Sequence, residues 1–254
     1  MLLQLEMLRL LELGYEAAHI RRAFGLGPDA DLHGMLAQVK AEGTSILASR
    51  RKRTHPEGPN SIWGEDTMGQ ICAVAVRVFH ERGYHGATMR DIARAVGIRA
   101  PSIYNHFPTK EALLHHVMMQ ILSVLRKQVN DALVESPEDP ISQMSTFIRE
   151  HIRFHLEYTS EAAVADNELR NLSEENRALV MAQRDDYEAI LQEILEQGWE
   201  QGVFTEEEIK LVKIAILTMC TAVAGWYQPA GVLSPGEVAE AYTRFALRMV
   251  GCAE

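Results

Sequence analysis

The chain has 254 residues, of which 47% are hydrophobic and 24% are charged, and its formal net charge at pH 7 is −10. This is the composition of a globular protein long enough for one large domain or two small ones. Charged residues interrupt the opening MLLQLEMLRLLELG, so it predicts neither a membrane span nor a secretory signal, and we expect a cytoplasmic protein without a membrane partner. The three widely spaced cysteines predict neither a zinc site nor a disulfide framework.

The charge is unevenly distributed along the chain. Residues 50–117 carry ten basic and six acidic side chains, whereas residues 118–254 carry 11 basic and 23 acidic side chains. An acidic surface repels nucleic acid, so any contact with phosphate should be confined to the middle segment.

Apolar residues recur at three- and four-residue spacing along nearly the whole chain, which predicts an all-α fold. Breaks rich in glycine, proline and polar turn formers divide it into four parts. These are a helical N-terminal extension at 1–48, a basic linker at 49–65, a compact helical segment at 66–112 and a larger helical body at 113–254.

The N-terminal extension contains LELGYEAAHIRRAFGLG, which resembles the stretch that follows the winged helix in mercury-resistance-type (MerR) regulators. The upstream reading helix and most of the wing are missing. Three interpretations stay open: a degenerate fragment kept as a helical accessory, the interior of a longer gene product that starts upstream, or a generic amphipathic helical pair. The linker, RRKRTHPEGPN, is either a flexible arm that reaches a phosphate backbone or a solvated spacer.

The segment 66–112 has the pattern of three short helices. The first begins at Asp66, and Gly83 is its predicted stop. Thr88 stands in the N-cap position of the second helix, with Asp91 where a capping box has its acid, and Gly97 closes that helix with a tight turn. A helix, a glycine-containing turn and another helix constitute a helix-turn-helix.

In a helix-turn-helix the second of the two helices enters the major groove of DNA. Here that helix is RAPSIYNHF, residues 99–107, in which Ile103 and Phe107 should face the other two helices. The remaining side chains then form a donor-rich outer surface suited to base edges and phosphates: Arg99, Ser102, Asn105 and His106, with Tyr104 at the flank. A small three-helix core with a merely solvated polar face is the alternative.

The stretch GYHGATMRDIARAVGIRAPSIYNHFPTKEALL resembles the DNA-binding signature of the tetracycline-repressor (TetR) family of transcriptional regulators, and the resemblance spans roughly residues 66–117. It implies that Thr88, Tyr104 and Lys110 anchor phosphates and that the polar side chains of the third helix lie along the groove. The residues expected to contact DNA are Thr88, Arg90, Arg99, Ser102, Tyr104, Asn105, His106 and Lys110. Arg99 and Ala100 depart from many members, so the operator sequence does not transfer.

One recognition helix reads only a few base pairs, so useful specificity requires two copies on a palindromic site. The resemblance implies a homodimer formed by the last two long helices, at residues 207–227 and 235–251. The first of these carries small residues that permit close packing: Ala215, Thr218, Ala222 and Gly225. A buried core helix would show a similar stripe.

The resemblance further implies that residues 113–254 bind a small-molecule effector between helices. The expected lining residues are Met118, Leu122, Phe147, His151, His155, Asn167, Arg170, Tyr187 and Trp226. The segment from Asn167 to Phe204 is similar to effector domains that sense acyl-CoA thioesters, and an aromatic or other hydrophobic molecule is the alternative. The CoA phosphates could meet Arg170, Arg177 or Arg184, or these arginines could pair with neighbouring acids.

His151 and His155 are four residues apart on one predicted helix, a spacing compatible with a metal pair, but the sequence offers no third ligand. We therefore expect core or pocket histidines, with no metal and no cofactor. The predicted function is a ligand-responsive DNA-binding repressor that a hydrophobic or acyl-CoA effector releases from its operator. The competing classes are an enzyme, for which nucleophile–base spacing is missing, and an all-helical adaptor that does not bind DNA.

Overall fold

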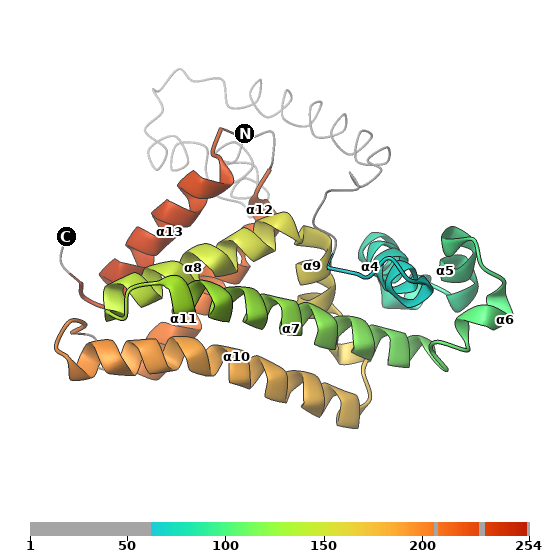
Figure 1. Cartoon of the computed structure of the whole chain (residues 1–254), viewed down its shortest axis with the longest axis horizontal. Coiled ribbons are helices and arrows are strands. Elements are labelled where there is room, and N and C mark those ends of the chain that lie inside the picture. Colours follow the sequence, from blue (N-terminus) through green and yellow to red (C-terminus); the bar gives the residue numbers. More distant parts are fainter. Residues whose placement is uncertain (1–61, 206–207, 229–231, 253–254) are drawn as a thin grey trace, which may run out of the picture. The chain divides into compact units, whose positions relative to one another are not determined.

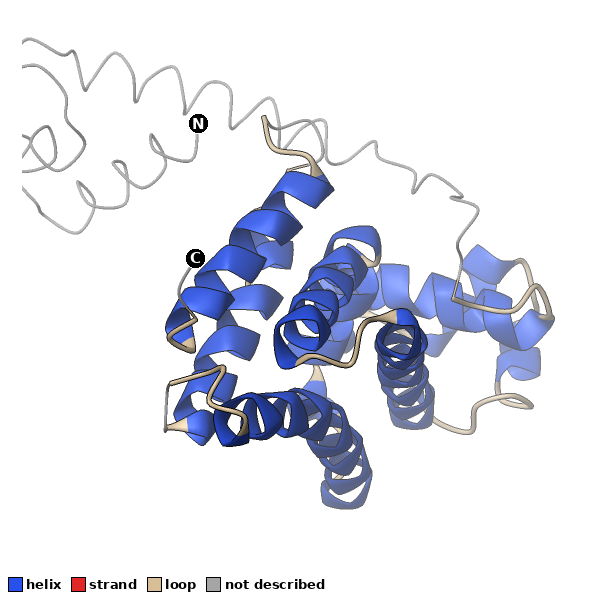
Figure 2. Ribbon diagram, turned by 60° about the vertical axis from the view of Figure 1, so that its left-hand side comes forward, coloured by secondary structure: helices blue, strands red, loops and turns tan. Residues whose placement is uncertain are grey.

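A computed structural model describes residues 62–205, 208–228 and 232–252. The predicted N-terminal extension and most of the basic linker lie outside these residues. Every regular element in the described part is a helix, as Figure 2 shows, so the predicted all-α fold is confirmed. With the labels of Figure 1, the helices are α4 (Thr67–Gly86), α5 (Met89–Val96), α6 (Ala100–Ile103), α7 (Lys110–Glu135), α8 (Pro140–Glu157), α9 (Thr159–Asn167), η1 (Leu169–Asn171), α10 (Glu174–Glu200), α11 (Ile209–Thr221), α12 (Val223–Trp226) and α13 (Pro235–Met249).

Helix α4 begins one residue after the predicted start, and it continues past its predicted stop at Gly83 to Gly86. The side chain of Asp66 accepts a hydrogen bond from the amide of Gly69 at 2.9 Å and so caps the first turn. Gly83 has φ 70°, which interrupts the helical conformation within the assigned helix. The buried face includes Ile71, Ala75 and Phe79, each at most 1% exposed, and it forms the centre of the three-helix unit.

Helix α5 has the predicted cap and turn. The hydroxyl of Thr88 accepts a hydrogen bond from the amide of Asp91 at 3.1 Å. Gly97 follows the helix with φ 85°, and the amide of Ile98 then bonds back to the carbonyl of Ala93 at 3.0 Å. This αL cap turns the chain sharply into α6.

Helices α4, α5 and α6 gather at one end of the long helix α7, as Figure 1 shows. Helix α7 continues without interruption across the predicted domain boundary between residues 112 and 113. The DNA-binding segment and the body therefore share one rigid helix. Helix α8 lies at the centre of the body, where it packs against α7, α10, α11 and α13.

Helix α9 connects the body to the three-helix unit. It packs on α4 as well as on α7 and α8. The indole of Trp63, just before α4, donates a hydrogen bond to Glu161 at 3.4 Å. The amide of Tyr84, near the end of α4, donates to Glu168 at 3.3 Å, directly after α9. Both ends of α4 are thus attached to the two ends of α9.

Candidate DNA-binding and effector-binding sites

The recognition helix is shorter than predicted. Regular α-helix covers only Ala100–Ile103, and Arg99 is its N-cap instead of its first residue. The chain nevertheless continues to coil: the amides of His106 and Phe107 both bond to the carbonyl of Ile103, at 3.1 and 3.0 Å. A proline in the first turn and another at position 108 limit the length of regular helix here. The reading element is therefore one short helix with a coiled turn.

This element presents the predicted outer surface. Ile103 and Phe107 are buried, at 0% and 5% exposure, and Phe107 packs against the ring of His116 on α7 with centroids 5.3 Å apart. Tyr104 is 48% exposed. Arg99, Asn105 and His106 are also exposed, Ser102 is half-buried, and Arg90 is exposed on α5. Because two apolar anchors fix the element, its polar side chains project from a rigid base.

Thr88 and Lys110, both predicted to contact phosphates, also make hydrogen bonds within the protein. The hydroxyl of Thr88 donates to the carboxylate of Asp91 at 2.6 Å, and this bond is the main cause that lowers the pKa of Asp91. The ammonium of Lys110 donates to the carbonyls of Tyr84 and Ala87 at 2.7 and 2.8 Å, and it lies 4.1 Å from the ring centre of Tyr84. An ammonium has three N–H groups, so two are already committed to the protein.

Lys110 consequently holds the α4–α5 turn against the start of α7. Burial lowers its pKa, in keeping with its position beneath this turn. Its neighbour Glu111 accepts from the amide of Ser173 at 3.0 Å and from the side chain of Asn176 at 2.8 Å. We therefore interpret Lys110 as a residue that positions the DNA-reading unit.

A buried cluster of histidines and aromatic rings occupies the core of the body. One ring nitrogen of His151 lies 2.7 Å from the hydroxyl of Tyr187, and the other lies 3.3 Å from the hydroxyl of Thr221. Phe147 stacks on Tyr187 with centroids 5.3 Å apart. The rings of His151 and His155 stack at 4.2 Å. Four of the predicted effector residues thus meet, and the predicted Met118 and Leu122 are buried in the same core.

Burial determines the protonation of this cluster. It lowers the pKa of both His151 and His155 and raises the pKa of Tyr187. The Nδ1–H group of His155 donates to the carbonyl of His151 at 2.8 Å, which partly offsets the effect of burial on its pKa. All three side chains are uncharged near neutral pH, so the cluster combines apolar rings with neutral hydrogen-bonding groups.

Stability should therefore fall in mild acid. The pKa of each buried histidine is lower in the folded than in the unfolded state, so stability is complete above about pH 6.5 and declines below it, by about 1.4 kcal/mol per pH unit for each histidine. Urea unfolding between pH 8 and pH 5 measures this decline. His155→Asn keeps a donor near the position of Nδ1 and should make the decline shallower; an equally steep decline in this variant would contradict the assignment.

Three predicted effector residues lie elsewhere. Asn167 and Arg170 are exposed, and the side chain of Asn167 bonds to the carbonyl of Ala163 in its own helix at 2.8 Å. Both lie at or beyond the end of α9, outside the buried cluster, so their contact with an effector stays a prediction. Trp226 is half-buried and donates to the hydroxyl of Tyr242 on α13 at 3.1 Å.

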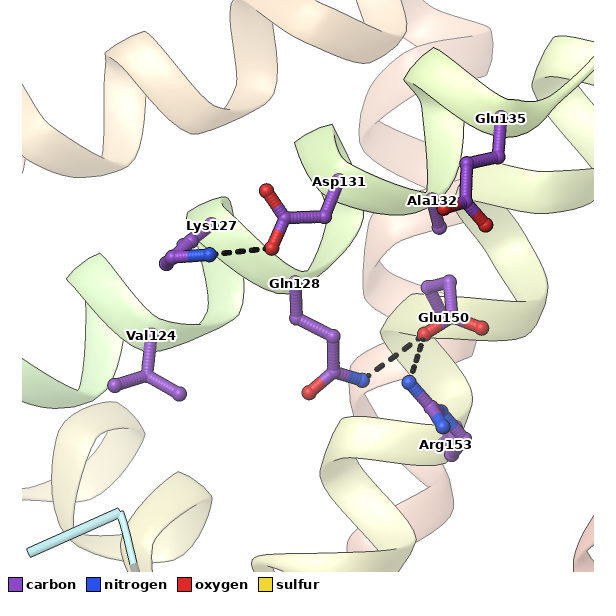
Figure 3. A pocket seen from close by; sticks show the side chains of 8 residues that line it. All are labelled: Val124, Lys127, Gln128, Asp131, Ala132, Glu135, Glu150 and Arg153. Carbon is purple, nitrogen blue, oxygen red and sulfur yellow. Dashed lines mark hydrogen bonds and ion pairs between the residues drawn. The ribbon is translucent and has the colours of Figure 1, made fainter.

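A hollow of about 450 Å³ lies on the outer side of α7 and α8, and Figure 3 shows its lining. Glu150 accepts from Gln128 at 3.1 Å and pairs with Arg153, while Lys127 pairs with Asp131. None of the predicted effector residues lines it. Four of its charged side chains, Lys127, Asp131, Glu150 and Arg153, pair with one another, so we do not assign it to the effector.

An apolar face is exposed on the last helices. Leu211 and Ile214 on α11 are 62% and 48% exposed, and Phe245 on α13 is 46% exposed. The small residues predicted to allow close packing, Ala215, Thr218, Ala222 and Gly225, are also exposed. By length and composition Ile209–Trp226 could cross a membrane, with mean hydropathy 1.6, and 17% of it is buried. A face of this kind also suits contact with a second copy of the chain.

Within the described residues, no group of three or more His, Cys, Asp or Glu side chains could hold a metal ion. Cys72 and Cys220 are buried free thiols, and burial raises the pKa of each to about 12. Neither thiol therefore has the thiolate character of a reactive cysteine.

A three-helix reading unit joined by one long helix to a helical body, with an exposed apolar face at the far helices, defines a helix-turn-helix regulator. Comparison with known families agrees. Residues 71–117 match the family described as "Bacterial regulatory proteins, tetR family", and residues 137–250 match "Tetracyclin repressor-like, C-terminal domain".

Solved structures and curated relatives point to the same family. The TetR-family transcriptional regulator PfmR from Thermus thermophilus is 33% identical, with a TM-score of 0.65 over 70% of this chain and 97% of PfmR. The transcriptional repressor KstR2 of Mycobacterium tuberculosis is 25% identical over 181 residues, which cover 70% of this chain and 90% of KstR2. AibR, solved with isovaleryl coenzyme A and operator DNA, is 24% identical, with a TM-score of 0.66 over 71% of this chain and 97% of AibR. The chain belongs to the TetR family of DNA-binding transcriptional regulators.

Sequence reasoning missed the residues that join the two parts of the molecule. Glu111 and Glu168 each accept backbone hydrogen bonds from partners 62 and 84 residues away along the chain. Gln183, which the sequence pattern did not single out, lies on the inner side of α10 between Val180 and Tyr187. Beside it lies Arg184, which was predicted to meet CoA phosphates or neighbouring acids and which pairs in the structure with Asp166 on α9.

Proposed function

We propose that the protein is a homodimeric repressor that binds a palindromic operator in the cytoplasm and leaves it when an effector binds. The observation that carries the proposal is the exposed polar surface of the reading element, fixed by buried Ile103 and Phe107. Family membership supports the same role, and the relatives named above are regulators, which supports a protein without catalytic activity. The exposed face on α11 and α13 supports the dimer.

For the effector, we propose an acyl-CoA thioester. The buried cluster supports this class because it combines apolar rings with neutral hydrogen-bonding groups, which suit an acyl chain with a carbonyl. AibR, which shares the fold, was solved with isovaleryl coenzyme A. An aromatic or other hydrophobic molecule is the second candidate, favoured by the stacked rings of Phe147 and Tyr187.

A gel shift on the DNA upstream of the protein's own gene tests the first step. The affinity should fall steeply as salt rises, because phosphate contacts release counterions. If no salt-dependent, sequence-dependent binding to DNA is found, the result would favour the all-helical adaptor over the repressor. Adding acyl-CoAs to the complex then tests the effector class, since release by no thioester would exclude it.

The roles along the reading element make a further prediction. Asn105→Ala and Ser102→Ala should change the preferred operator sequence, each by about 1–3 kcal/mol at one base pair. Tyr104→Phe should weaken binding to all sequences alike, because a hydroxyl that contacts phosphate carries no base information. Selection from a randomised operator library measures both effects. Uniform losses in all three variants would contradict the assigned roles.

A further inference from the structure

Two buried polar atoms on the inner side of α10 have no hydrogen-bond partner in the described part of the chain: Nε of Arg184 and Oε1 of Gln183. One is a donor and the other an acceptor, and the residues are adjacent. A buried polar atom without a partner is unfavourable. A bound ligand that supplies a hydrogen-bond partner to both atoms would remove this cost, which favours the ligand-bound protein over the free protein.

The rest of the Arg184 side chain holds the end of α9. Its Nη2 donates to the carbonyl of Ala165 at 2.7 Å and to the carboxylate of Asp166 at 3.1 Å. The side chain of Arg184 is a quarter exposed as a whole, although its Nε atom is buried. Arg184 and Asp166 also lie close enough to His155 to shift its pKa in opposite directions. The contact thus lies beside the buried histidine cluster.

The end of α9 leads directly to the DNA-reading unit. Two residues beyond Asp166, Glu168 accepts the hydrogen bond from the amide of Tyr84. At the other end of α9, Glu161 accepts from Trp63. A displacement of α9 therefore has to move α4 or break one of these bonds.

We propose that Gln183 and Arg184 bind a secondary amide of the effector, and that this contact withdraws Arg184 from α9 and so releases α4. An amide carbonyl would accept from Nε–H of Arg184, and the amide N–H would donate to Oε1 of Gln183. The pantetheine arm of an acyl-CoA carries two such amides. The inference rests on the proposed acyl-CoA effector and adds the group that is recognised and the route to the DNA-reading unit.

The attachment of α9 can be tested without any ligand. Arg184→Met removes it and should lower operator affinity about tenfold in the free protein, within the usual range of coupling between sites. It should also speed hydrogen exchange at the Tyr84 amide, while the amides of α8 stay protected. Arg177→Met is the matched control, an exposed arginine on the same helix, and should change neither quantity. Wild-type affinity and exchange in Arg184→Met would overturn the proposal.

Two further variants separate amide binding from the attachment. Arg184→Lys keeps a cation near Ala165 and Asp166 but has no Nε–H, and Gln183→Leu removes only the acceptor. Each should need about tenfold more isovaleryl-, phenylacetyl- or octanoyl-CoA for release than the wild type, compared at equal initial occupancy of the operator. Unchanged release in both would overturn the amide contact. If no thioester releases the wild type from the operator, the proposed effector class is wrong, and the amide contact is wrong with it. The comparison of Arg184→Met with Arg177→Met needs no ligand, so it still tests whether Arg184 holds α9.

Discussion

Leu211→Glu is expected to convert the dimer into monomers and to reduce operator affinity at least about 100-fold, because a monomer reads only half of a palindromic site. Leu211 is 62% exposed in the single chain and lies on the same helix face as Ile214. In a two-fold interface each residue meets the same surface patch on its partner, so glutamates from both copies would be buried without partners. Light scattering measures the oligomeric state, and a gel shift measures the affinity.

Leu179→Glu provides the control for this experiment. Leu179, like Leu211, is an exposed leucine, with 49% of its surface exposed. It lies on α10 and not on α11 or α13. This variant should remain dimeric and bind the operator normally. A stable dimer in Leu211→Glu with full DNA affinity would show that α11 does not form the interface.

Lys110→Met is expected to lower the free energy of unfolding by about 2–3 kcal/mol, because two carbonyls lose a charged donor beneath the α4–α5 turn. Operator affinity should fall for every sequence as the reading unit loosens. The dependence of the affinity on salt should stay as in the wild type, because the slope counts phosphate contacts. Urea unfolding and gel shifts across salt concentrations measure these quantities.

A phosphate contact by Lys110 would give the opposite pattern. The salt slope would then fall by about one, while stability would hardly change. Lys127→Met is the matched control on the same helix: Lys127 pairs with Asp131 at the surface, and such pairs contribute little to stability. This variant should leave both the unfolding curve and the operator affinity unchanged.

The local features of the reading unit were predictable from the sequence. The cap at Thr88 and the turn at Gly97 are present as predicted, whereas Asp66 caps the first helix and Gly83 bends it three residues before its end. Each depends on atoms within a few residues, so the residue types alone determine it. The inward direction of Ile103 and Phe107 followed for the same reason, from their four-residue spacing. The length of the recognition helix did not follow, because the coil after Ile103 continues without regular helix.

The effector region was predictable only in part. The spacing of His151 and His155 placed both on one face, and the structure adds the contact with Tyr187 that brings them into a cluster. Helix spacing could not show that Asn167 lies beyond the packed part of α9 and points outward. Which side chains meet depends on how α8, α9 and α10 cross.

By itself, the sequence determined an all-helical regulator, the order of its reading helices and the stripe of small residues from Ala215 to Gly225. Only the tertiary structure decided that Lys110 supports a turn, that Glu168 attaches the body to α4, and that Arg184 holds the end of α9. The physical reason is the range of the interactions. Capping and helix periodicity act within one or two turns, whereas these hydrogen bonds join atoms 19 to 84 residues apart.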